Sequence, residues 1–325
     1  MTPVVSIIIC TRNRDRSLKE TLDAIAAIEV PADLPTELLV VDNGSTDQTS
    51  EVIRDCVATN LSAHYLSEPN GGKSVGLNSA LKIARGQILL FTDDDVRPPQ
   101  NWIDGLCRPI LEDKADAVQG GIRIADHLRR PWMSDGHSGL PASTEHWKAN
   151  QTFHLVGANM SIARRVFDKI GGFDPAIGPG PAAGGEDTLL SYQMERAGFR
   201  ILLRNEIAVV HHFDPDRLTR AAMHQAAAKG AVSDFFIDYH WLHKDISHPH
   251  LRLLRARCRL LIYRLRLWSQ WRNHEAMPDW EKGMIQEIAV LRLYIARRGE
   301  PRAYHEPRAC SRKGAEALPS RLAKS

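Results

Sequence analysis

Residues 87–95 read Gln87-Ile88-Leu89-Leu90-Phe91-Thr92-Asp93-Asp94-Asp95, an apolar run that leads directly into three acidic residues. Four consecutive apolar side chains indicate a strand that is buried on both faces. In open α/β folds ligands bind beyond the carboxyl ends of such strands, so the triplet is expected at a ligand-binding edge. Neighbouring carboxylates raise one another's pKa values, and a divalent cation with oxygen ligands is the simplest positive partner. The alternative is an ordinary acidic surface loop.

The composition is typical of a soluble protein. The chain has 325 residues, which is long enough for one large domain with an appendage or for two domains. Its hydrophobic fraction of 43% is ordinary for a soluble protein. No segment holds the roughly 18 uninterrupted apolar residues of a transmembrane helix, and the N-terminus lacks the features of a signal peptide. The five cysteines are scattered, which favours free thiols in a reducing compartment over disulfides or a zinc site. We therefore expect a cytoplasmic protein.

The first hundred residues alternate strand and helix patterns. Strands are predicted at residues 4–10, 37–41, 63–66 and 88–91, and helices at 17–28, 49–58 and 75–84. This rhythm predicts βαβ units with right-handed crossovers. The expected fold class is therefore α/β, with helices flanking a sheet whose polar, Gly-rich loops form one binding edge.

Beyond residue 100 the pattern is less regular. Further strands are predicted at 118–124, 153–160, 201–203 and 207–210, and helices at 164–170 and 186–197, around a long loop at 126–150. From residue 217 the chain is predicted to be helical, with breaks near Pro249 and Pro278. We expect a main α/β domain over residues 1–230, a helical appendage over 231–300 and a disordered tail over 301–325.

Five polar clusters follow the predicted strands in order. They are Cys10-Thr11-Arg12-Asn13-Arg14, Val41-Asp42-Asn43-Gly44-Ser45-Thr46-Asp47, Asn70-Gly71-Gly72-Lys73-Ser74, Asp93-Asp94-Asp95 and Gly184-Gly185-Glu186-Asp187. Together with Gly171-Gly172-Phe173-Asp174, their order and spacing resemble glycosyltransferase family 2 over roughly residues 4–230. The resemblance implies a GT-A fold, a Rossmann-like mixed sheet flanked by helices, and an inverting transferase that uses a nucleotide sugar.

The resemblance assigns the donor nucleotide to the first two clusters. The residues implied in binding it are Thr11, Arg12, Arg14, Asp42, Asn43 and Gly44. The Asp42 carboxylate would accept a hydrogen bond from the N–H of a pyrimidine base. The alternatives are an Asx-turn at Asp42 and a solvated charge at Arg14.

The third cluster leads into a predicted helix, so its backbone N–H groups and the Lys73 ammonium can approach an anion. Many family members carry an Ala-Arg-Asn triplet just downstream, where this chain has Gly76-Leu77-Asn78. The arginine is therefore absent, and Lys73 is expected to replace it in donor binding. The alternative is a plain turn.

The acidic triplet corresponds to the family motif that meets both the donor and a metal ion. The resemblance implies that Asp93 and Asp94 contact the ribose or the sugar, and that Asp95 binds Mg²⁺ or Mn²⁺. The metal would bridge the diphosphate and stabilise charge on the leaving nucleoside diphosphate. His211 is the expected second metal ligand, with a structural or solvent-facing His211-His212 pair as the alternative.

Glu186-Asp187 matches a two-residue acidic motif of the family. Asp187 is implied as the general base, which takes the proton of the acceptor hydroxyl as that oxygen attacks the anomeric carbon. The acceptor or sugar side is expected to include Asn159, Glu186 and Trp132. The alternatives are a helix start that favours the helix dipole and a 126–150 loop anchored to the core by its tryptophans.

The C-terminal part of the chain is basic. Residues 251–325 contain 17 Lys and Arg against 7 Asp and Glu, whereas residues 1–250 contain 25 against 32. Over residues 251–272 arginines separate two apolar stripes at helical spacing, one expected to pack on the catalytic domain and the other to meet a lipid interface or a partner subunit. The alternative is a packed helix with solvated arginines. We expect peripheral attachment to the inner face of the plasma membrane, and no nucleic-acid partner because no recognition motif accompanies the arginines.

The sequence thus predicts a metal-dependent hexosyltransferase. The reaction would move a sugar, most simply from a UDP-sugar, to a hydroxyl of a glycan or lipid-linked saccharide in cell-surface polysaccharide synthesis. A nucleotidyltransferase is the competing enzyme class, but residues 10–14 lack the glycines expected there after the first strand. A non-catalytic scaffold on the same fold is disfavoured because Asp93, Asp95 and Asp187 are all present.

Overall fold

The structure is a computed structural model that describes residues 2–56, 62–139, 141–148, 151–177, 184–272 and 275–304. The described residues fall into two compact units. The first holds the residues up to Asp214 other than Gly184 and Gly185, and the second holds these two glycines and the residues from Pro215 onward. The domain boundary expected at residue 230 therefore falls inside the second unit. Residues 305–325 of the tail expected to be disordered lie outside the described residues.

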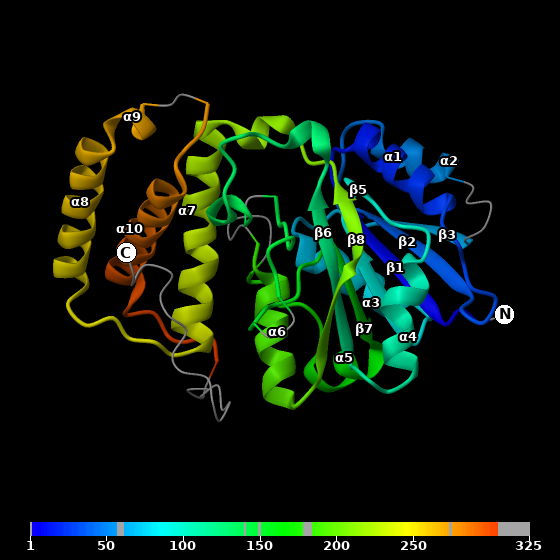
Figure 1. The fold of residues 1–325 in the computed structure, drawn as a ribbon. Coiled ribbons are helices and arrows are strands. Elements are labelled where there is room, and N and C mark those ends of the chain that lie inside the picture. The colour runs from blue at the N-terminus through cyan, green and yellow to red at the C-terminus, as the bar shows by residue number, and fades with distance from the viewer. Residues whose placement is uncertain are drawn as a thin grey trace. The chain divides into compact units, whose positions relative to one another are not determined.

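An eight-stranded mixed sheet forms the centre of the described part of the first unit (Figure 1). Its strands are β1 (Val5–Thr11), β2 (Thr36–Asp42), β3 (Ser62–Ser67), β4 (Ile88–Thr92), β5 (Val96–Arg97), β6 (Ala117–Ile124), β7 (Asn159–Ala163) and β8 (Ile201–His211). The strand order is β3-β2-β1-β4-β7-β6-β8-β5, in which β3, β2, β1 and β4 run parallel and β7 runs antiparallel to both of its neighbours. The predicted α/β class with a mixed sheet is confirmed.

Helices flank this sheet and link its strands. They are α1 (Asp15–Ala26), α2 (Thr49–Asp55), α3 (Lys73–Ile83), α4 (Trp102–Leu111), α5 (Arg164–Ile170) and α6 (Glu186–Ala197), with the short 3₁₀ helices η1 (Asp126–Leu128) and η2 (Asp135–His137). The central strands read as continuous apolar runs because both of their faces are covered. In β1, for example, Ile7, Ile8 and Ile9 are each 0% exposed. Helices α5 and α6 begin and end where the sequence predicts.

Helix α4 has no counterpart among the predicted helices. Its interior contains Gly105 and Pro109, both of which disfavour a helix in isolation. Packing explains the glycine, because a Cβ at Gly105 would lie 2.6 Å from Cδ1 of Ile207. Trp102 and Ile103 are 0% exposed, so the helix is stabilised by tertiary burial rather than by local propensity.

The strand predicted at residues 153–160 is displaced, because β7 covers only its end. Before β7, side chains rather than a neighbouring strand satisfy the backbone N–H groups. Val156 N donates to Oε1 of Gln119 at 2.7 Å, and Gly157 N donates to Oδ2 of Asp187 at 2.9 Å. This irregular segment therefore brings its backbone to α6 and to the candidate base.

The two strands predicted at 201–203 and 207–210 are one strand, β8, which pairs with β6 through a bulge. The register shifts between Gly120 and Gly121. A Cβ on Gly121 would lie 2.2 Å from the carbonyl oxygen of Asn205, so this close approach requires glycine. Beyond the bulge the pairing of β6 with β8 resumes at Gly121 and Ala208 and continues to Ile124 and His211.

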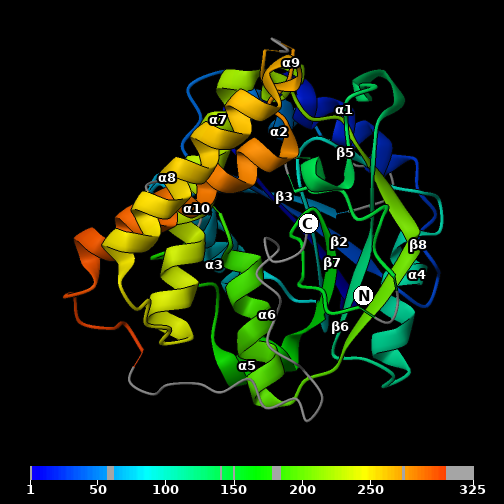
Figure 2. The ribbon, with the colours of Figure 1, turned by 60° about the vertical axis from the view of Figure 1, so that its left-hand side comes forward.

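The second unit contains α7 (Arg220–Phe236), α8 (Pro249–Arg266), α9 (Trp268–Trp271) and α10 (Asp279–Arg297), with the short helices η3 (Pro215–Leu218) and η4 (Ile237–Trp241). Helix α10 packs against both α7 and α8 (Figure 2). Pro249 starts α8 and Pro278 precedes α10, so the predicted breaks are confirmed. Glu281 is fully buried and accepts hydrogen bonds from Arg264 at 2.6 Å and Trp271 at 3.1 Å, which ties α8, α9 and α10 together. In the described part of the chain, every helix is too short or too polar to cross a bilayer.

Candidate active site

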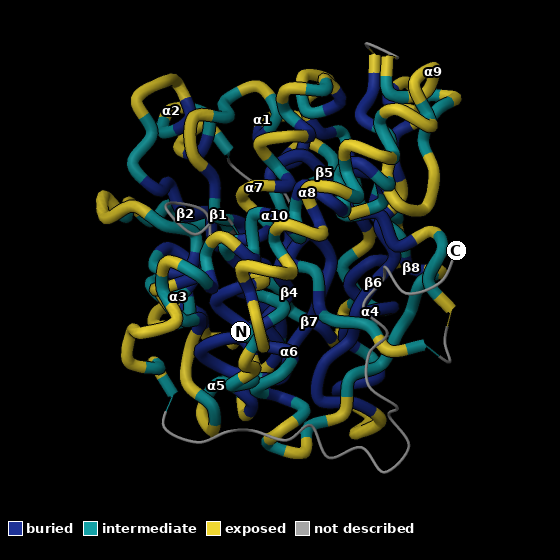
Figure 3. Tube along the Cα trace, turned by 90° about the vertical axis from the view of Figure 1, so that its left-hand side faces the viewer, coloured by how far each residue is buried: buried dark blue, intermediate teal, exposed yellow. Residues whose placement is uncertain are grey.

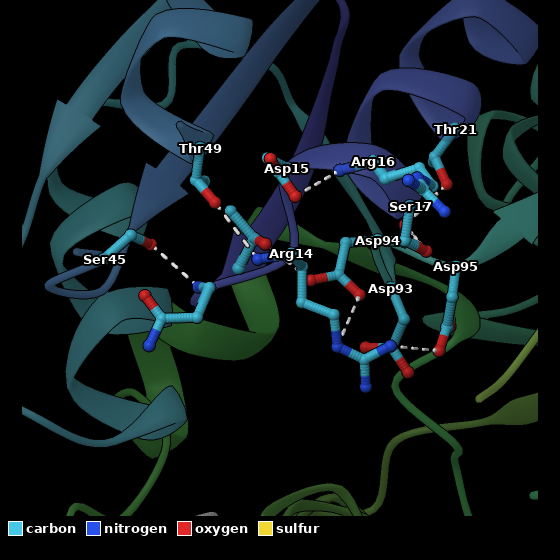
Figure 4. A network of polar contacts seen from close by, with 12 residues as sticks. Arg14, Asp15, Arg16, Ser17, Thr21, Ser45, Thr49, Asp93, Asp94 and Asp95 are labelled. Atoms are coloured by element: carbon cyan, nitrogen blue, oxygen red, sulfur yellow. Dashed lines mark hydrogen bonds and ion pairs between the residues drawn. The ribbon is translucent and has the colours of Figure 1, made fainter. Parts of the chain in front are cut away.

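Loops from parallel strands meet at one edge of the sheet. Thr11 at the end of β1 is in register with Asp42 at the end of β2, and Ile9 is in register with Thr92 at the end of β4. The polar residues that follow these strands therefore start side by side. Figure 4 shows Arg14, which follows β1, beside the acidic triplet that follows β4.

Two cationic side chains lie against the triplet. Arg14 Nη1 lies 3.2 Å from Oδ2 of Asp95, and Arg14 Nε lies 4.0 Å from Oδ1 of Asp94. Lys73 Nζ lies 2.6 Å from Oδ1 of Asp93. Burial alone would lower the pKa of Arg14, but the three aspartates outweigh it and raise that pKa. The protein itself thus supplies part of the positive charge that the clustered carboxylates require.

Asp94 is tied into the protein. Its Oδ2 accepts a hydrogen bond from Thr11 Oγ1 at 2.5 Å, and its carbonyl oxygen accepts from Ser17 Oγ at 2.9 Å and Thr21 Oγ1 at 2.7 Å. Burial raises the pKa of Asp94 to about 6, although Arg14 opposes the rise. Asp94 and Thr11, both expected to contact the donor, therefore fasten the triplet to β1 and α1.

The second cluster folds into a local side-chain turn at Asp42, but the bonded amide is three residues on, at Ser45, and not two residues on as in the expected Asx-turn. Ser45 N donates to Oδ1 of Asp42 at 2.8 Å, and the Tyr65 hydroxyl donates to Oδ2 at 3.2 Å. Gly44 has a φ of 75°, in the left-handed region that favours glycine. Each carboxylate oxygen of Asp42 keeps a further lone pair, so the turn does not exhaust the capacity of Asp42 to accept hydrogen bonds.

Asn43 clamps the neighbouring third cluster. Gly72 N donates to Oδ1 of Asn43 at 3.0 Å, and Asn43 Nδ2 donates to the carbonyl oxygen of Asn70 at 3.1 Å. The exposed Arg12 reaches the same loop, because a Cβ on Gly71 would lie 3.9 Å from its Nη1. The first three clusters thus form one continuous rim.

Lys73 begins α3 and lies between two acidic residues. Its Nζ is 2.6 Å from Oδ1 of Asp93 and 3.9 Å from Oε1 of Glu186. Burial alone would lower the pKa of Lys73, but these carboxylates outweigh it and raise that pKa, so the ammonium stays charged. Leu77, which stands where many family members have arginine, is only 4% exposed and belongs to the core. Lys73 is therefore the cation that this loop offers to a ligand.

Asp187, the second residue of α6, is held by two backbone amides. Gly157 N donates to Oδ2 at 2.9 Å and Thr188 N donates to Oδ1 at 2.7 Å. A Cβ on Gly157 would lie 3.6 Å from Lys73 Nζ and 3.8 Å from Oδ2 of Asp187, so both side chains lie against the same glycine. The half-buried Asp187 therefore joins the Lys73–Asp93 pair in one cluster.

Glu186 is buried more deeply than its neighbour in the motif. Its side chain is 6% exposed, and among the described residues its Oε2 has no hydrogen-bond partner. Burial, reinforced by the charge of Asp187, raises the pKa of Glu186 to about 7, while Lys73 opposes the rise. A buried carboxyl with an open oxygen can accept a hydrogen bond from a ligand hydroxyl or donate one to it.

His211 and Asp95 form a buried pair. Nε2 of His211 lies 3.0 Å from Oδ1 of Asp95, and the two side chains are 3% and 4% exposed. The other ring nitrogen, Nδ1, lies 2.7 Å from the carbonyl oxygen of Pro141 and must carry a hydrogen, because a carbonyl only accepts. A neutral ring would then present the Nε2 lone pair to the carboxylate. The contact therefore requires a cation between the two groups, either a second proton or a metal ion.

The same pair fits a divalent metal. Adjacent ligands of an octahedral ion at about 2.1 Å from it lie about 3 Å apart, and the Nε2 and Oδ1 atoms have that separation. Over the described ranges, no group of three or more His, Cys, Asp or Glu side chains is placed to hold a metal. Mg²⁺ sites are commonly completed by substrate phosphates and water, so these two residues suit an ion that binds together with a diphosphate.

Asn159, expected on the acceptor side, lies in the interior instead. It is 0% exposed, and its Oδ1 accepts a hydrogen bond from Trp102 Nε1 at 2.8 Å. Its Nδ2 donates to the carbonyl oxygens of Gly121 at 2.7 Å and Ile207 at 3.0 Å. Asn159 therefore satisfies the backbone beside the β6–β8 bulge and is out of reach of an acceptor.

Trp132 has a packing partner within its own loop. It is half-buried, and its ring centroid lies 5.2 Å from that of the buried His137. The loop is attached to the sheet at Thr144, whose Oγ1 accepts from Ile122 N at 2.8 Å and donates to Oδ1 of Asn205 at 2.7 Å. The loop is thus anchored to the sheet, but through Thr144 and not through its tryptophans as the alternative had it, and it also supplies the Pro141 carbonyl to the metal candidate.

Two important contributors to the site left no signal in the sequence. The N–H of Gly157 and the carbonyl of Pro141 act through the backbone, which every residue type shares. Tyr65 was also missed, because its place in β3 suggests packing rather than a hydroxyl directed at Asp42.

The chain is similar to known glycosyltransferases. It is 26% identical over 222 residues to the probable glycosyltransferase YdaM of Bacillus subtilis (strain 168), a match that covers 61% of this chain and 48% of that protein. It is 28% identical over 217 residues to the succinoglycan biosynthesis protein ExoM of Rhizobium meliloti (strain 1021), with 65% of this chain and 67% of that protein covered. The chain spans about half the length of the first curated relatives it matches.

The fold is shared with a mannosyltransferase from Pyrobaculum calidifontis that was solved in complex with GDP-Man and Mn²⁺. The TM-score is 0.64 at 19% identity, and the match covers 91% of this chain and 88% of that one. The mixed sheet and its flanking helices are thus the GT-A fold that the sequence predicted. Residues 6–171 also match the profile described as Glycosyl transferase family 2. Because that match covers more than half of the 325 residues, the chain belongs to Glycosyl transferase family 2.

Proposed function

We propose that this protein is an inverting, metal-dependent hexosyltransferase that moves a sugar from a nucleoside-diphosphate donor to a hydroxyl of a saccharide acceptor. One arrangement carries the proposal. Asp187 is oriented by two backbone amides next to the Lys73–Asp93 pair, and Asp95 with His211 forms a second pair that suits a metal ion. Family membership supports the class of reaction, and this geometry supports the individual roles.

The donor nucleotide in this proposal lies across the ends of β1 and β2. Asp42 accepts a hydrogen bond from the single ring N–H of a pyrimidine base, which favours a UDP-sugar as the simplest donor and equally admits a dTDP-sugar. Arg12 and Arg14 contact the charged part of the nucleotide, since Arg12 lies on the rim near Gly71 and Arg14 lies beside the acidic triplet. Thr11, Asn43 and Gly44 shape this binding edge through the contacts described above. The neighbour in fold was solved with GDP-Man, so a guanine nucleotide is the natural competitor in a binding test.

In this proposal the diphosphate lies between the metal ion and the ammonium group of Lys73. Asp95 and His211 would hold Mg²⁺ or Mn²⁺, which when bound would stabilise the negative charge of the departing diphosphate. Lys73 Nζ moves from Asp93 to a phosphate oxygen, because a diphosphate carries more charge than one carboxylate. Asp93, released from its ion pair, accepts a hydrogen bond from a hydroxyl of the ribose or the sugar. The presence of Mn²⁺ in the neighbour of shared fold supports the choice of metal.

Asp187 takes the proton. The acceptor hydroxyl gives its proton to the carboxylate while its oxygen bonds to the anomeric carbon. The bond from that carbon to the diphosphate oxygen breaks, and its electron pair leaves with the nucleoside diphosphate. A single displacement inverts the anomeric configuration. The N–H groups of Gly157 and Thr188 fix the carboxylate and leave lone pairs for the proton, while the open Oε2 of Glu186 binds a hydroxyl of the transferred sugar.

The acceptor in this proposal is a glycan or a lipid-linked saccharide of cell-surface polysaccharide synthesis. The similarity to ExoM, which is named for succinoglycan biosynthesis, supports this class. Free thiols at Cys10, Cys56, Cys107 and Cys258 support a reducing, cytoplasmic setting.

A donor screen tests the proposal. The full-length protein is mixed with Mn²⁺ and UDP-, GDP- and dTDP-linked hexoses, and binding is measured as a rise in melting temperature. The donor that binds is then offered to saccharide acceptors, and NMR reports the anomeric configuration of the product. We expect a UDP-sugar to bind and the product to be inverted. Retained configuration would contradict the single displacement, and unchanged melting with every donor would contradict the donor site.

A further inference from the structure

Helix α8 and the start of α9 carry an exposed apolar stripe. Its members are Leu251, Leu254, Leu261, Ile262, Leu265 and Trp268, whose exposed fractions are 45%, 58%, 60%, 45%, 63% and 48%. At 100° per residue the five members on α8 share one face of the helix, with the exposed Cys258 at its centre. Figure 3 shows long exposed stretches along α8. Large apolar side chains gathered in this way mark an interaction surface.

The stripe is not the packing face of the helix. On the opposite side Ala256 is buried, and Leu253 and Leu260 pack with it against Ile288 and Leu291 of α10. Helix α8 thus has one apolar face that the second unit covers and another that it leaves exposed. The covered face accounts for the stability of the helix in the unit, so the stripe needs a separate explanation.

The charged residues that α8 and α9 themselves carry are all arginines. Residues 249–272 contain seven arginines and no aspartate or glutamate. Arg259 pairs with Glu287, and Arg264 lies 2.6 Å from Oε1 of Glu281, so these two help to join α8 to α10. At helical spacing Arg255 and Arg266 lie along one border of the stripe.

The positive charge of α8 indicates which kind of partner binds the stripe. A second copy of the helix would bring arginine against arginine, which opposes pairing of two stripes. The segment 305–325 of this chain has five Lys and Arg against two Glu, so it carries the same sign of charge. An apolar face bordered by arginines complements a bilayer surface that offers acyl chains below and anionic head groups above.

We propose that the stripe of α8 and α9 binds the surface of an anionic lipid membrane. The leucines enter the interface between head groups and acyl chains, while Arg255 and Arg266 extend to the phosphates. Trp268 lies at the end of the stripe, where its amphipathic ring suits the interfacial region. The proposal does not depend on the transferase activity, because the stripe belongs to the second unit and the residues proposed for catalysis belong to the first.

Vesicle sedimentation tests the apolar contribution. The full-length protein is mixed with vesicles of phosphatidylcholine alone or with 30% phosphatidylglycerol, where roughly one lipid in three is anionic. We expect binding to the anionic vesicles and at least tenfold weaker binding of L261Q/L265Q. The matched control is I83Q/L111Q, which removes two apolar side chains of the first unit that are 44% and 40% exposed. Equal binding of L261Q/L265Q and the control would overturn the proposal.

A second pair of variants tests the charge. R255Q/R266Q should bind anionic vesicles at least about tenfold more weakly than the parent protein. Added salt should weaken the vesicle binding of the parent protein more than that of this variant. The matched control, R292Q/R298Q, removes two exposed arginines from the region of α10 and should retain most of the binding. A salt-independent interaction, or an equal effect of the two pairs, would contradict a membrane surface.

A probe on Cys258 locates the contact. Burial raises the pKa values of the Cys10 and Cys107 thiols, which slows their labelling at neutral pH, and Cys56 and Cys310 are replaced by serine. A polarity-sensitive fluorophore on Cys258 should shift to the blue with anionic vesicles and stay unchanged with neutral ones. A blue shift without vesicles, accompanied by a dimer in sedimentation velocity, would show that a second copy occupies the stripe and would overturn the proposal. Donor turnover on a soluble acceptor should stay unchanged in every variant of the stripe.

Discussion

The Nε2 atom of His211 lies 3.0 Å from Oδ1 of Asp95, in a pair that solvent barely reaches. The two residues come from different parts of the sheet, since Asp95 follows β4 and His211 ends β8. Val96, the residue after Asp95, is paired with His211 in the β5–β8 ladder. Backbone pairing therefore sets the distance between the two candidate metal ligands, and the site is rigid before any ion arrives.

Removal of divalent metal should stop transfer. We expect EDTA to abolish turnover and Mn²⁺ or Mg²⁺ to restore it, because the diphosphate then leaves without a compensating charge. H211A should weaken Mn²⁺ binding in the presence of the nucleoside diphosphate by at least tenfold, as measured by titration calorimetry. H212A is the control, because His212 is the next residue and its ring packs near His127 instead. Full turnover in EDTA would rule out the metal role.

Substitution of Asp187 by asparagine should lower kcat by at least about 100-fold, because the amide cannot accept the proton. The donor dissociation constant should change little, since the side chain keeps its size and its contact with the N–H of Gly157. D168N is the matched control, because Asp168 is exposed on α5. E186Q should retain more turnover than D187N. The opposite order would transfer the base role to Glu186.

Substitution of Lys73 by glutamine should weaken donor binding by roughly tenfold to a hundredfold, since a charged hydrogen bond to phosphate is lost. K82Q, on the exposed side of the same helix, serves as the control. The loss of affinity should be smaller for a nucleoside than for its diphosphate, and titration calorimetry measures both affinities. An equal loss for both ligands would place Lys73 at the base or ribose.

The stability of the ligand-free protein should depend on the protonation of Glu186. Burial raises the pKa of Glu186 to about 7 from its usual 4.5, so the folded state favours the protonated form. Its contribution is fully present below pH 4.5 and is lost as the pH rises through 7. The difference is on the order of 3 kcal/mol. Chemical denaturation at pH 5 and pH 8 measures the free energy of unfolding at each pH. Between these pH values that free energy should fall more for the parent protein than for E186Q, and an equal fall in both proteins would contradict the shifted pKa.

The sequence predicted the central part of this fold well and its periphery less well. Strands such as β4 are recognisable because both faces are buried, which makes every residue from Ile88 to Phe91 apolar. Helix α4 could not be predicted, since Gly105 and Pro109 contradict helix propensity and only packing against β8 explains them. The displaced start of β7 has a similar cause, because side chains on distant elements replace the expected ladder.

The candidate site was predictable where residue type carries the chemistry. The acidic residues and Lys73 at the ends of strands predicted a charged cluster, and in the structure Lys73 lies against Asp93. Asn159 could not be assigned correctly, because an amide that serves the backbone of a bulge looks the same in sequence as one that faces a ligand. Backbone groups such as the Pro141 carbonyl are invisible to any argument from residue type.

The loop that contains Pro141 has a consequence for how this protein can diversify. It is pinned at Thr144 to β6 and at Pro141 to His211, while Glu145 and Ser134 on either side of these anchors are exposed. Substitutions at the exposed positions remove no atom of the contact between the Pro141 carbonyl and the imidazole of His211. A substitution of Thr144 would remove the hydroxyl that joins the loop to β6, whereas a substitution of Pro141 would keep the carbonyl that faces Nδ1 of His211. The positions of this loop that can vary freely and the contacts that hold the imidazole are thus located at different residues.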